Sequence, residues 1–116
     1  MTALDYNERF FASLSNSGSG EVTPDTVFHY RQRGRVVWAT YDGGEILCGT
    51  LVAKVLDDGA LEMRYSHVNR AGDLMTGRCR STPEMLPDGR LRLHESWQWT
   101  CGDCSAGHSI VEEIKR

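Results

Sequence analysis

The amino-acid sequence predicts an all-β fold, an up-and-down antiparallel β-barrel of about eight strands with a short N-terminal helix. Turn signals rich in Gly, Asp, Asn and Pro recur at intervals of roughly 10–16 residues, slightly longer than in short-stranded sandwiches. The segments between them alternate apolar and polar residues, as half-buried strands do. A meander of this length tends to close into a barrel, because closure removes the exposed strand edges.

The chain of 116 residues suits one domain, residues 1–116, that can bury a core without a disulfide or a metal. The net charge of −3, with no basic patch, argues against a nucleic-acid partner. No run approaches a membrane span, and the N-terminus lacks the basic start and apolar run of a signal peptide. We therefore expect a cytoplasmic protein without a membrane partner, whose cysteines are mostly thiols.

The first element in chain order is the predicted helix. Tyr6, Phe10 and Leu14 follow the spacing i, i+4, i+8, Asp5 could cap the helix, and "SNSGSGEV" ends it. We expect residues 1–20 to form this helix and a loop, and residues 21–116 to form the barrel. The helix would lay its aromatic stripe over one barrel mouth. The alternative is a terminal segment packed loosely on the outside.

Alternation assigns a face to the residues of most later strands. The expected inward residues are Phe28, Tyr30 and Gln32; Leu47, Gly49, Leu51 and Ala53; Leu61, Met63, Tyr65 and His67; Met75, Gly77 and Cys79; and Leu91, Leu93, Glu95, Trp97 and Trp99. The inner faces of strands 35–42 and 107–116 stay open. The strand 46–55 is apolar on both faces, as in a strand covered on both sides.

The C-x-x-C pair, Cys101 and Cys104, has three interpretations. The favoured one is a hairpin loop with two incidental thiols, since Gly and Asp between the cysteines are turn residues. A zinc site would need His94 or His108 as further ligands, because the other two cysteines lie in strand interiors and are not spaced as a pair. A redox pair usually sits at a helix N-terminus, and this pair follows a strand. We therefore expect no metal and no cofactor.

The carboxylate of Glu95 is the most informative group. Alternation places it inward between Leu93 and Trp97, where an unpaired charge costs several kcal/mol. Its expected companions on the inner faces are Tyr65 and His67, joined by Tyr30, Gln32 and Glu112. Such a cluster can be a polar network that holds the strand register, the polar side of a ligand pocket, or an acid/base centre at Glu95 or His67.

Other inward residues have two interpretations each. Gly49 and Gly77 leave space that indicates either a cavity or a bend of the barrel. Trp38, Trp97 and Trp99 are large enough to form a pocket wall or plain core.

The stretches "VVWATYDGGEILCGTLVAKVLDDGALEMRYSHVN" and "LMTGRCRSTPEMLPDGRLRLHESWQWTCGDCSAGHSIVEE" resemble a group of small bacterial proteins commonly labelled n-acetylglutamate synthase. The resemblance runs from about Glu21 to the end and is most distinctive at "HESWQWT". It implies a compact antiparallel barrel of the calycin or lipocalin-like kind and no catalytic residue. The label fits the residues badly, because "RQRGRVV" is a poor match to an acetyl-CoA phosphate turn and no helix follows it.

We therefore predict a binding protein rather than an enzyme: a barrel whose small-molecule ligand is held inside by Tyr30, Tyr65, His67, Glu95, Trp97 and Trp99. An enzyme is the first alternative, either the acetyltransferase of the label or a lipocalin-type lyase that uses Glu95 as acid/base. The second is a dimeric interaction or structural protein joined through outer barrel faces, indicated by the two-sided apolar strand 46–55.

Overall fold

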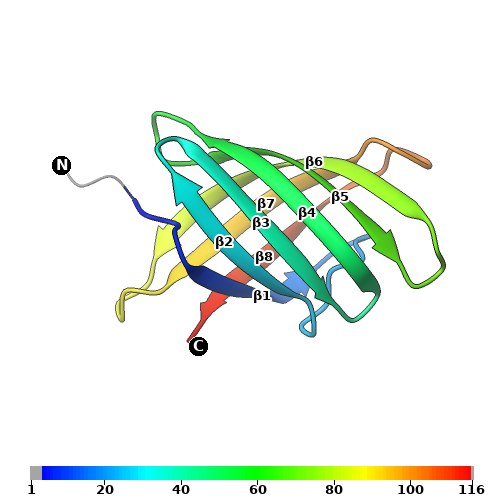
Figure 1. The fold of residues 1–116 in the computed structure, drawn as a ribbon, viewed down its shortest axis with the longest axis horizontal. Coiled ribbons are helices and arrows are strands. Elements are labelled where there is room, and N and C mark those ends of the chain that lie inside the picture. The colour runs from blue at the N-terminus through cyan, green and yellow to red at the C-terminus, as the bar shows by residue number, and fades with distance from the viewer. Residues whose placement is uncertain (1–3, 116) are drawn as a thin grey trace.

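The computed structural model describes residues 4–115 and consists of one closed antiparallel barrel (Figure 1). Each strand pairs with the next in the chain, and the last pairs with the first, so the predicted all-β barrel is confirmed. The strands are Arg9–Asn16 (β1), Val27–Arg33 (β2), Val36–Gly43 (β3), Ile46–Val55 (β4), Leu61–Asn69 (β5), Leu74–Met85 (β6), Leu91–Trp99 (β7) and Ala106–Ile114 (β8). Residues 1–3 and 116, which the sequence placed in the helical segment and the last strand, lie outside the described residues.

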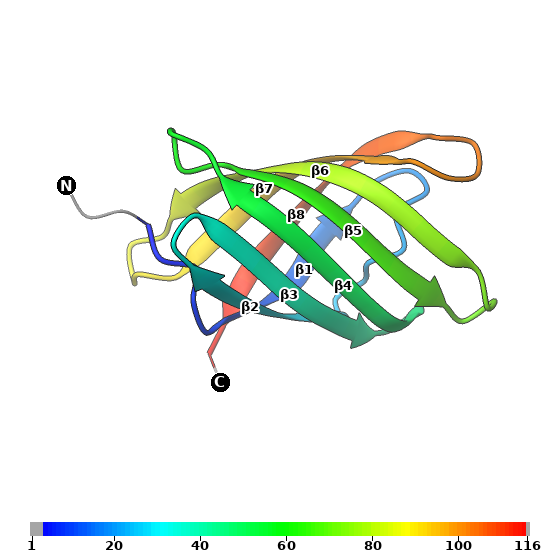
Figure 2. The same cartoon turned by 45° about the horizontal axis from the view of Figure 1, so that its top comes forward.

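Tight turns join the strands at the predicted places, and the two ends of the barrel differ (Figure 2). One end carries the β2–β3, β4–β5 and β6–β7 turns and the N-terminal segment. The other carries the β3–β4, β5–β6 and β7–β8 turns and the longer β1–β2 connection, residues 17–26. Gly59 and Gly89 have φ of +86° and +88°, a conformation that only glycine adopts without strain, and each allows a sharp reversal between long strands.

The predicted N-terminal helix is wrong, because residues 9–16 form β1, which closes the barrel between β2 and β8. The barrel therefore begins at β1 and not at residue 21. Residues four apart share a face in a strand as well as in a helix, so the spacing of Phe10 and Leu14 did not discriminate between them. Both lie on the outer side of β1, where Leu14 is 52% exposed, and the inward residue is the fully buried Phe11.

Tyr6 precedes β1 in an extended segment and closes the N-terminal end of the barrel. It is fully buried, its hydroxyl donates to the carbonyl of Gly59 at 2.7 Å, and its backbone N–H donates to Gln32 Oε1 at 2.8 Å. Leu61, Leu91 and other apolar side chains fill this half of the barrel. Each such side chain contributes roughly 1.5–3 kcal/mol by burial, so this end is the packed core.

Most predicted faces are confirmed, with one correction in β4. Leu51 and Ala53 point inward, but Leu47 is 53% exposed and Ile46 is buried in its place. The pairing of β4 with β5 shifts register between Ile46 and Cys48, as in a β-bulge, and a one-residue shift exchanges the two faces. The structure also assigns the two strands left open: Val37, Ala39 and Tyr41 are buried in β3, and Ser109, Val111 and Glu113 in β8.

Residues 4–115 include no helix that is long and apolar enough to cross a membrane.

Candidate functional site

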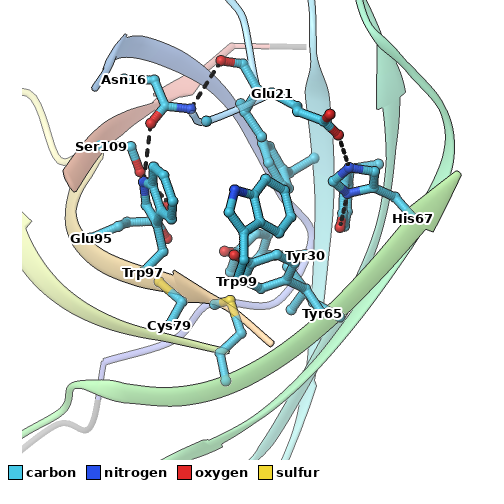
Figure 3. Close-up of a pocket in the computed structure, with 16 residues that line it drawn as sticks. Asn16, Glu21, Tyr30, Tyr65, His67, Cys79, Glu95, Trp97, Trp99 and Ser109 are labelled. Carbon is cyan, nitrogen blue, oxygen red and sulfur yellow. Dashed lines mark hydrogen bonds and ion pairs between the residues drawn. The ribbon is translucent and has the colours of Figure 1, made fainter. Parts of the chain in front are cut away.

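A cavity of about 50 Å³ lies inside the half of the barrel that the 17–26 connection covers. A buried water needs about 10–15 Å³ on this scale, so the cavity has room for about three or four water-sized groups. Six residues predicted from the sequence line it together: Tyr30 from β2, Tyr65 and His67 from β5, and Glu95, Trp97 and Trp99 from β7 (Figure 3). Period-two alternation in three separate strands thus converges on one space.

The aromatic walls depend on glycines in the neighbouring strands. Tyr41 pairs with Gly49 and Tyr65 with Gly77. A Cβ added to Gly49 would lie 2.5 Å from Tyr41 Cζ, and one added to Gly77 would lie 2.6 Å from Tyr65 Cε2, so each ring covers its glycine. The glycines therefore accommodate rings that lie across the sheet, rather than marking a bend or opening the cavity directly.

Glu95 lies on the cavity wall between two serines. Ser81 Oγ donates to one carboxylate oxygen at 2.5 Å, and Ser109 Oγ donates to the other at 3.2 Å. The strand register produces this arrangement, since Ser81 in β6 and Ser109 in β8 are the direct neighbours of Glu95 on either side. Burial raises the pKa of the Glu95 carboxyl, and the two serine hydrogen bonds counteract part of that effect.

The companions predicted for Glu95 are therefore partly wrong. Tyr65 and His67 share the cavity with it, but neither forms a hydrogen bond with it. Gln32 lies at the other end, where it accepts the N–H of Tyr6, and Glu112 pairs with arginines of the barrel end. The two serines were missed because a serine on an inner face carries no signal until its cross-strand partner is known.

His67 belongs to a second polar cluster at the rim of the cavity. Its Nε2 lies 2.8 Å from Glu21 Oε1, its Nδ1 lies 3.0 Å from the hydroxyl of Tyr41, and Asn69 Nδ2 donates to Glu21 Oε2 at 3.0 Å. A carboxylate can only accept, so Nε2 carries a proton. In the neutral ring, Nδ1 then accepts from Tyr41. The histidine thus ties β5 to β3 and to the connection that contains Glu21.

The last residue of β1 and the connection to β2 cover one side of the cavity (Figure 3). Trp97 Nε1 donates to Asn16 Oδ1 at 3.0 Å, and Trp99 Nε1 donates to Ser19 Oγ at 3.1 Å. The sequence placed the residues up to 20 in the predicted helix and its loop, and it assigned no role to Asn16, Ser19 or Glu21. The signal was indirect: a buried indole N–H requires an acceptor, and two inward tryptophans therefore require two.

The remaining ionisable groups on the cavity wall are neutral. Burial raises the pKa of the phenols of Tyr30, Tyr41 and Tyr65 and of the Cys79 thiol. No lysine or arginine is among the residues on the wall. The groups there that can carry charge are consequently the carboxyls of Glu95 and Glu21 and the imidazole of His67.

Two candidate groups from the sequence lie elsewhere. Trp38 is on the outer face of β3, 38% exposed, and so belongs neither to the pocket wall nor to the core. Cys101 and Cys104 are free thiols in the β7–β8 loop, as the favoured interpretation predicts. His94 pairs with Glu84, and within residues 4–115 no group of three or more His, Cys, Asp or Glu could hold a metal ion.

The chain was compared with known proteins in three ways. A family model described as an avidin-like protein matches residues 4–114. A search of the curated proteins and a search of the solved structures each found no match. The family match supports a calycin-like barrel and gives no support to the label n-acetylglutamate synthase.

Proposed function

The chain belongs to the avidin-like family, and we propose that it binds a small organic molecule in the cavity beneath the β1–β2 connection. Barrels of this family typically bind small ligands. The ligand must be inferred from the residues of the cavity, because proteins that share a fold can bind different ligands.

The observation that carries this proposal is the set of unused polar groups on an aromatic wall. The side chains of Tyr30 and Tyr65 line the cavity, and their hydroxyls form no hydrogen bond with any residue between 4 and 115. Tyr30 is only 1% exposed, so its hydroxyl faces the cavity and not the outer surface of the barrel. Buried polar groups without protein partners need a ligand or ordered water, and a few such groups on an apolar wall are typical of a ligand pocket.

The volume limits the ligand. Sites for drug-sized molecules enclose about 300–1,000 Å³, several times the 50 Å³ of this cavity. The closed barrel therefore accepts a molecule or head group of a few non-hydrogen atoms. A longer ligand would extend towards the 17–26 connection, where Ser19 accepts a hydrogen bond from Trp99 and Glu21 accepts one from His67.

Nuclear magnetic resonance of the tryptophan indole N–H groups tests the proposal, because the three tryptophans include a built-in control. A chemically diverse set of small compounds should contain one that shifts the signals of Trp97 and Trp99 saturably and leaves the signal of Trp38 unchanged. Replacement of Tyr65 by Phe, which removes one unused hydroxyl, should weaken that binding. The matched control is Thr82→Ala on the outer face of β6. Failure of every compound to move the two inner signals would refute the proposal.

A second candidate concerns a partner: we propose that the outer faces of β3 and β4 associate with a second copy of the chain. Trp38 and Val52 are direct cross-strand neighbours there, and Val52 is 55% exposed. Adjacent exposed apolar side chains of this size indicate an interaction surface. Light scattering should give a dimer for the native chain and a monomer for Val52→Lys. A monomeric native chain at all accessible concentrations would refute the dimer.

A further inference from the structure

We propose that the ligand is a small organic cation, with its charge beside Glu95 and its apolar part against Trp97 and Trp99. This inference rests on the proposed small-molecule function and assigns the chemical class of the ligand.

The charges on the cavity wall are the first argument. Glu21 has His67 as a partner at 2.8 Å, and Asn69 satisfies its second oxygen. Glu95 interacts with the neutral hydroxyls of Ser81 and Ser109 and with the neutral thiol of Cys79, and no lysine or arginine lines the cavity. Glu95 is therefore the carboxylate on the wall that has no histidine, lysine or arginine beside it.

The hydrogen-bonding capacity of Glu95 is the second argument. An ionised carboxylate offers about four acceptor positions, and the two serines and the weak thiol donor of Cys79 do not use all of them. The ionised form is disfavoured by burial without an opposite charge. A cation with N–H donors would supply both the missing charge and the missing donors, whereas an anion would add a like charge beside the carboxylate.

The aromatic groups favour the same class of ligand. The ring centroids of Trp97 and Trp99 lie 5.7 Å apart, and those of Tyr65 and Trp99 lie 5.8 Å apart in an edge-to-face arrangement. The face of an aromatic ring attracts a cation placed within about 6 Å of its centroid. The two indole N–H groups already donate to Asn16 and Ser19, so they are not free to hold an anion.

Neutral groups on the wall are compatible with this assignment. The hydroxyls of Tyr30 and Tyr65 can accept an N–H from the ligand as well as donate to it. The cavity also matches a compact cation, since the guanidinium or ammonium group of a small amine occupies about the space of three or four waters.

Three small probes of similar size and different charge test the inference: methylguanidinium, N-methylurea and acetate. Each is titrated into the native protein while the indole N–H signals of Trp97, Trp99 and Trp38 are followed. We expect methylguanidinium to shift the first two signals with an affinity about tenfold or more above that of N-methylurea, because only the cation gains the charge attraction. Acetate should leave both signals unchanged.

Two variants locate the preference. Glu95→Gln keeps the shape and one oxygen that accepts from a serine, and it should reduce the cation's advantage over N-methylurea to about twofold or less. Glu45→Gln alters an exposed carboxylate in the β3–β4 turn and should leave the advantage unchanged. If Glu95→Gln does not fold, the comparison of the three probes on the native protein still decides the charge preference.

The outcomes separate this inference from the proposed function. Equal affinity for methylguanidinium and N-methylurea, or tighter binding of acetate, would overturn the cation assignment and leave a small-molecule pocket in place. A cation preference that survives Glu95→Gln would overturn the role of Glu95. Absence of any shift at Trp97 and Trp99 with the cation would overturn the inference, and the diverse compound set would then decide the proposed function independently.

Discussion

The substitution Gly49→Ala should destabilise the protein more than Gly77→Ala, although each adds one methyl group beneath an aromatic ring. The added Cβ would lie 2.5 Å from Tyr41 Cζ in the first case and 2.6 Å from Tyr65 Cε2 in the second. Other atoms of both rings would lie closer still, and ordinary contact begins at 3.4 Å, so each ring must move by at least about 1 Å. The difference between the two sites is the freedom of the ring to move.

Tyr41 has little freedom to move. It stacks on Phe28 at a centroid distance of 4.7 Å, its hydroxyl lies 3.0 Å from His67 Nδ1, and it is 3% exposed. Overpacking at such a site costs about 1–3 kcal/mol, and a lost hydrogen bond adds about 0.5–1.5 kcal/mol. The reduced entropy of the unfolded chain offsets about 0.4–1 kcal/mol. We therefore expect Gly49→Ala to lower the free energy of unfolding by about 0.5–4 kcal/mol.

Tyr65 faces the cavity and has an unpartnered hydroxyl, so its ring can shift inward. Gly77→Ala should therefore change the free energy of unfolding by about 1 kcal/mol or less and reduce the cavity volume instead. Urea unfolding followed by tryptophan fluorescence measures both variants. Thr82→Ala on the outer face of β6 is the control, with an expected effect within about 0.5 kcal/mol. Equal stability of the two glycine variants would refute the argument from ring mobility.

Three further predictions concern the polar groups around the cavity. Glu95→Gln should stabilise the protein at neutral pH, because burial raises the folded-state pKa of Glu95. The stability of the native protein therefore falls as pH rises from the unfolded pKa of about 4.3 through the folded pKa. Urea unfolding across this range should show that the two proteins have the same stability at the acid end. Ser81→Ala should cost about 1–3 kcal/mol and more than Ser109→Ala, because its hydrogen bond to Glu95 is 2.5 Å against 3.2 Å; the reverse order in chemical denaturation would contradict this. Asn16→Ala removes the acceptor of the Trp97 indole N–H, so that proton should exchange faster with solvent in a hydrogen-exchange experiment while the Trp38 proton is unchanged.

The strand pattern was predictable because it depends on local rules. Alternation placed Tyr65, His67, Glu95 and Trp97 on inner faces, and all of them lie there. The turn residues at 57–59 and 87–89 lie between β4 and β5 and between β6 and β7. Both signals arise within a few residues of one another, so a single sequence contains them.

The failures have equally physical causes. The spacing of Phe10 and Leu14 is compatible with a helix and with a strand. The segment forms a strand because it pairs with both β2 and β8 and so closes the barrel. Alternation alone placed Leu47 inward, and this was wrong because the register shifts just before Cys48. A bulge of this kind cannot be recognised from the residue types of the strand. Trp38 was considered for the pocket wall because size alone does not tell an inner from an outer face.

What the sequence determined by itself is the all-β barrel and the set of inward side chains, since turn chemistry and period-two alternation are local. What only the tertiary structure decided is how these side chains are partnered: Glu95 with Ser81 and Ser109, His67 with Glu21, Trp97 with Asn16 at the end of β1, and Trp99 with Ser19 in the β1–β2 connection. These pairs join residues between 14 and 81 positions apart. Strand register and barrel closure bring them within hydrogen-bonding distance, and neither is encoded in the spacing of residues along one strand.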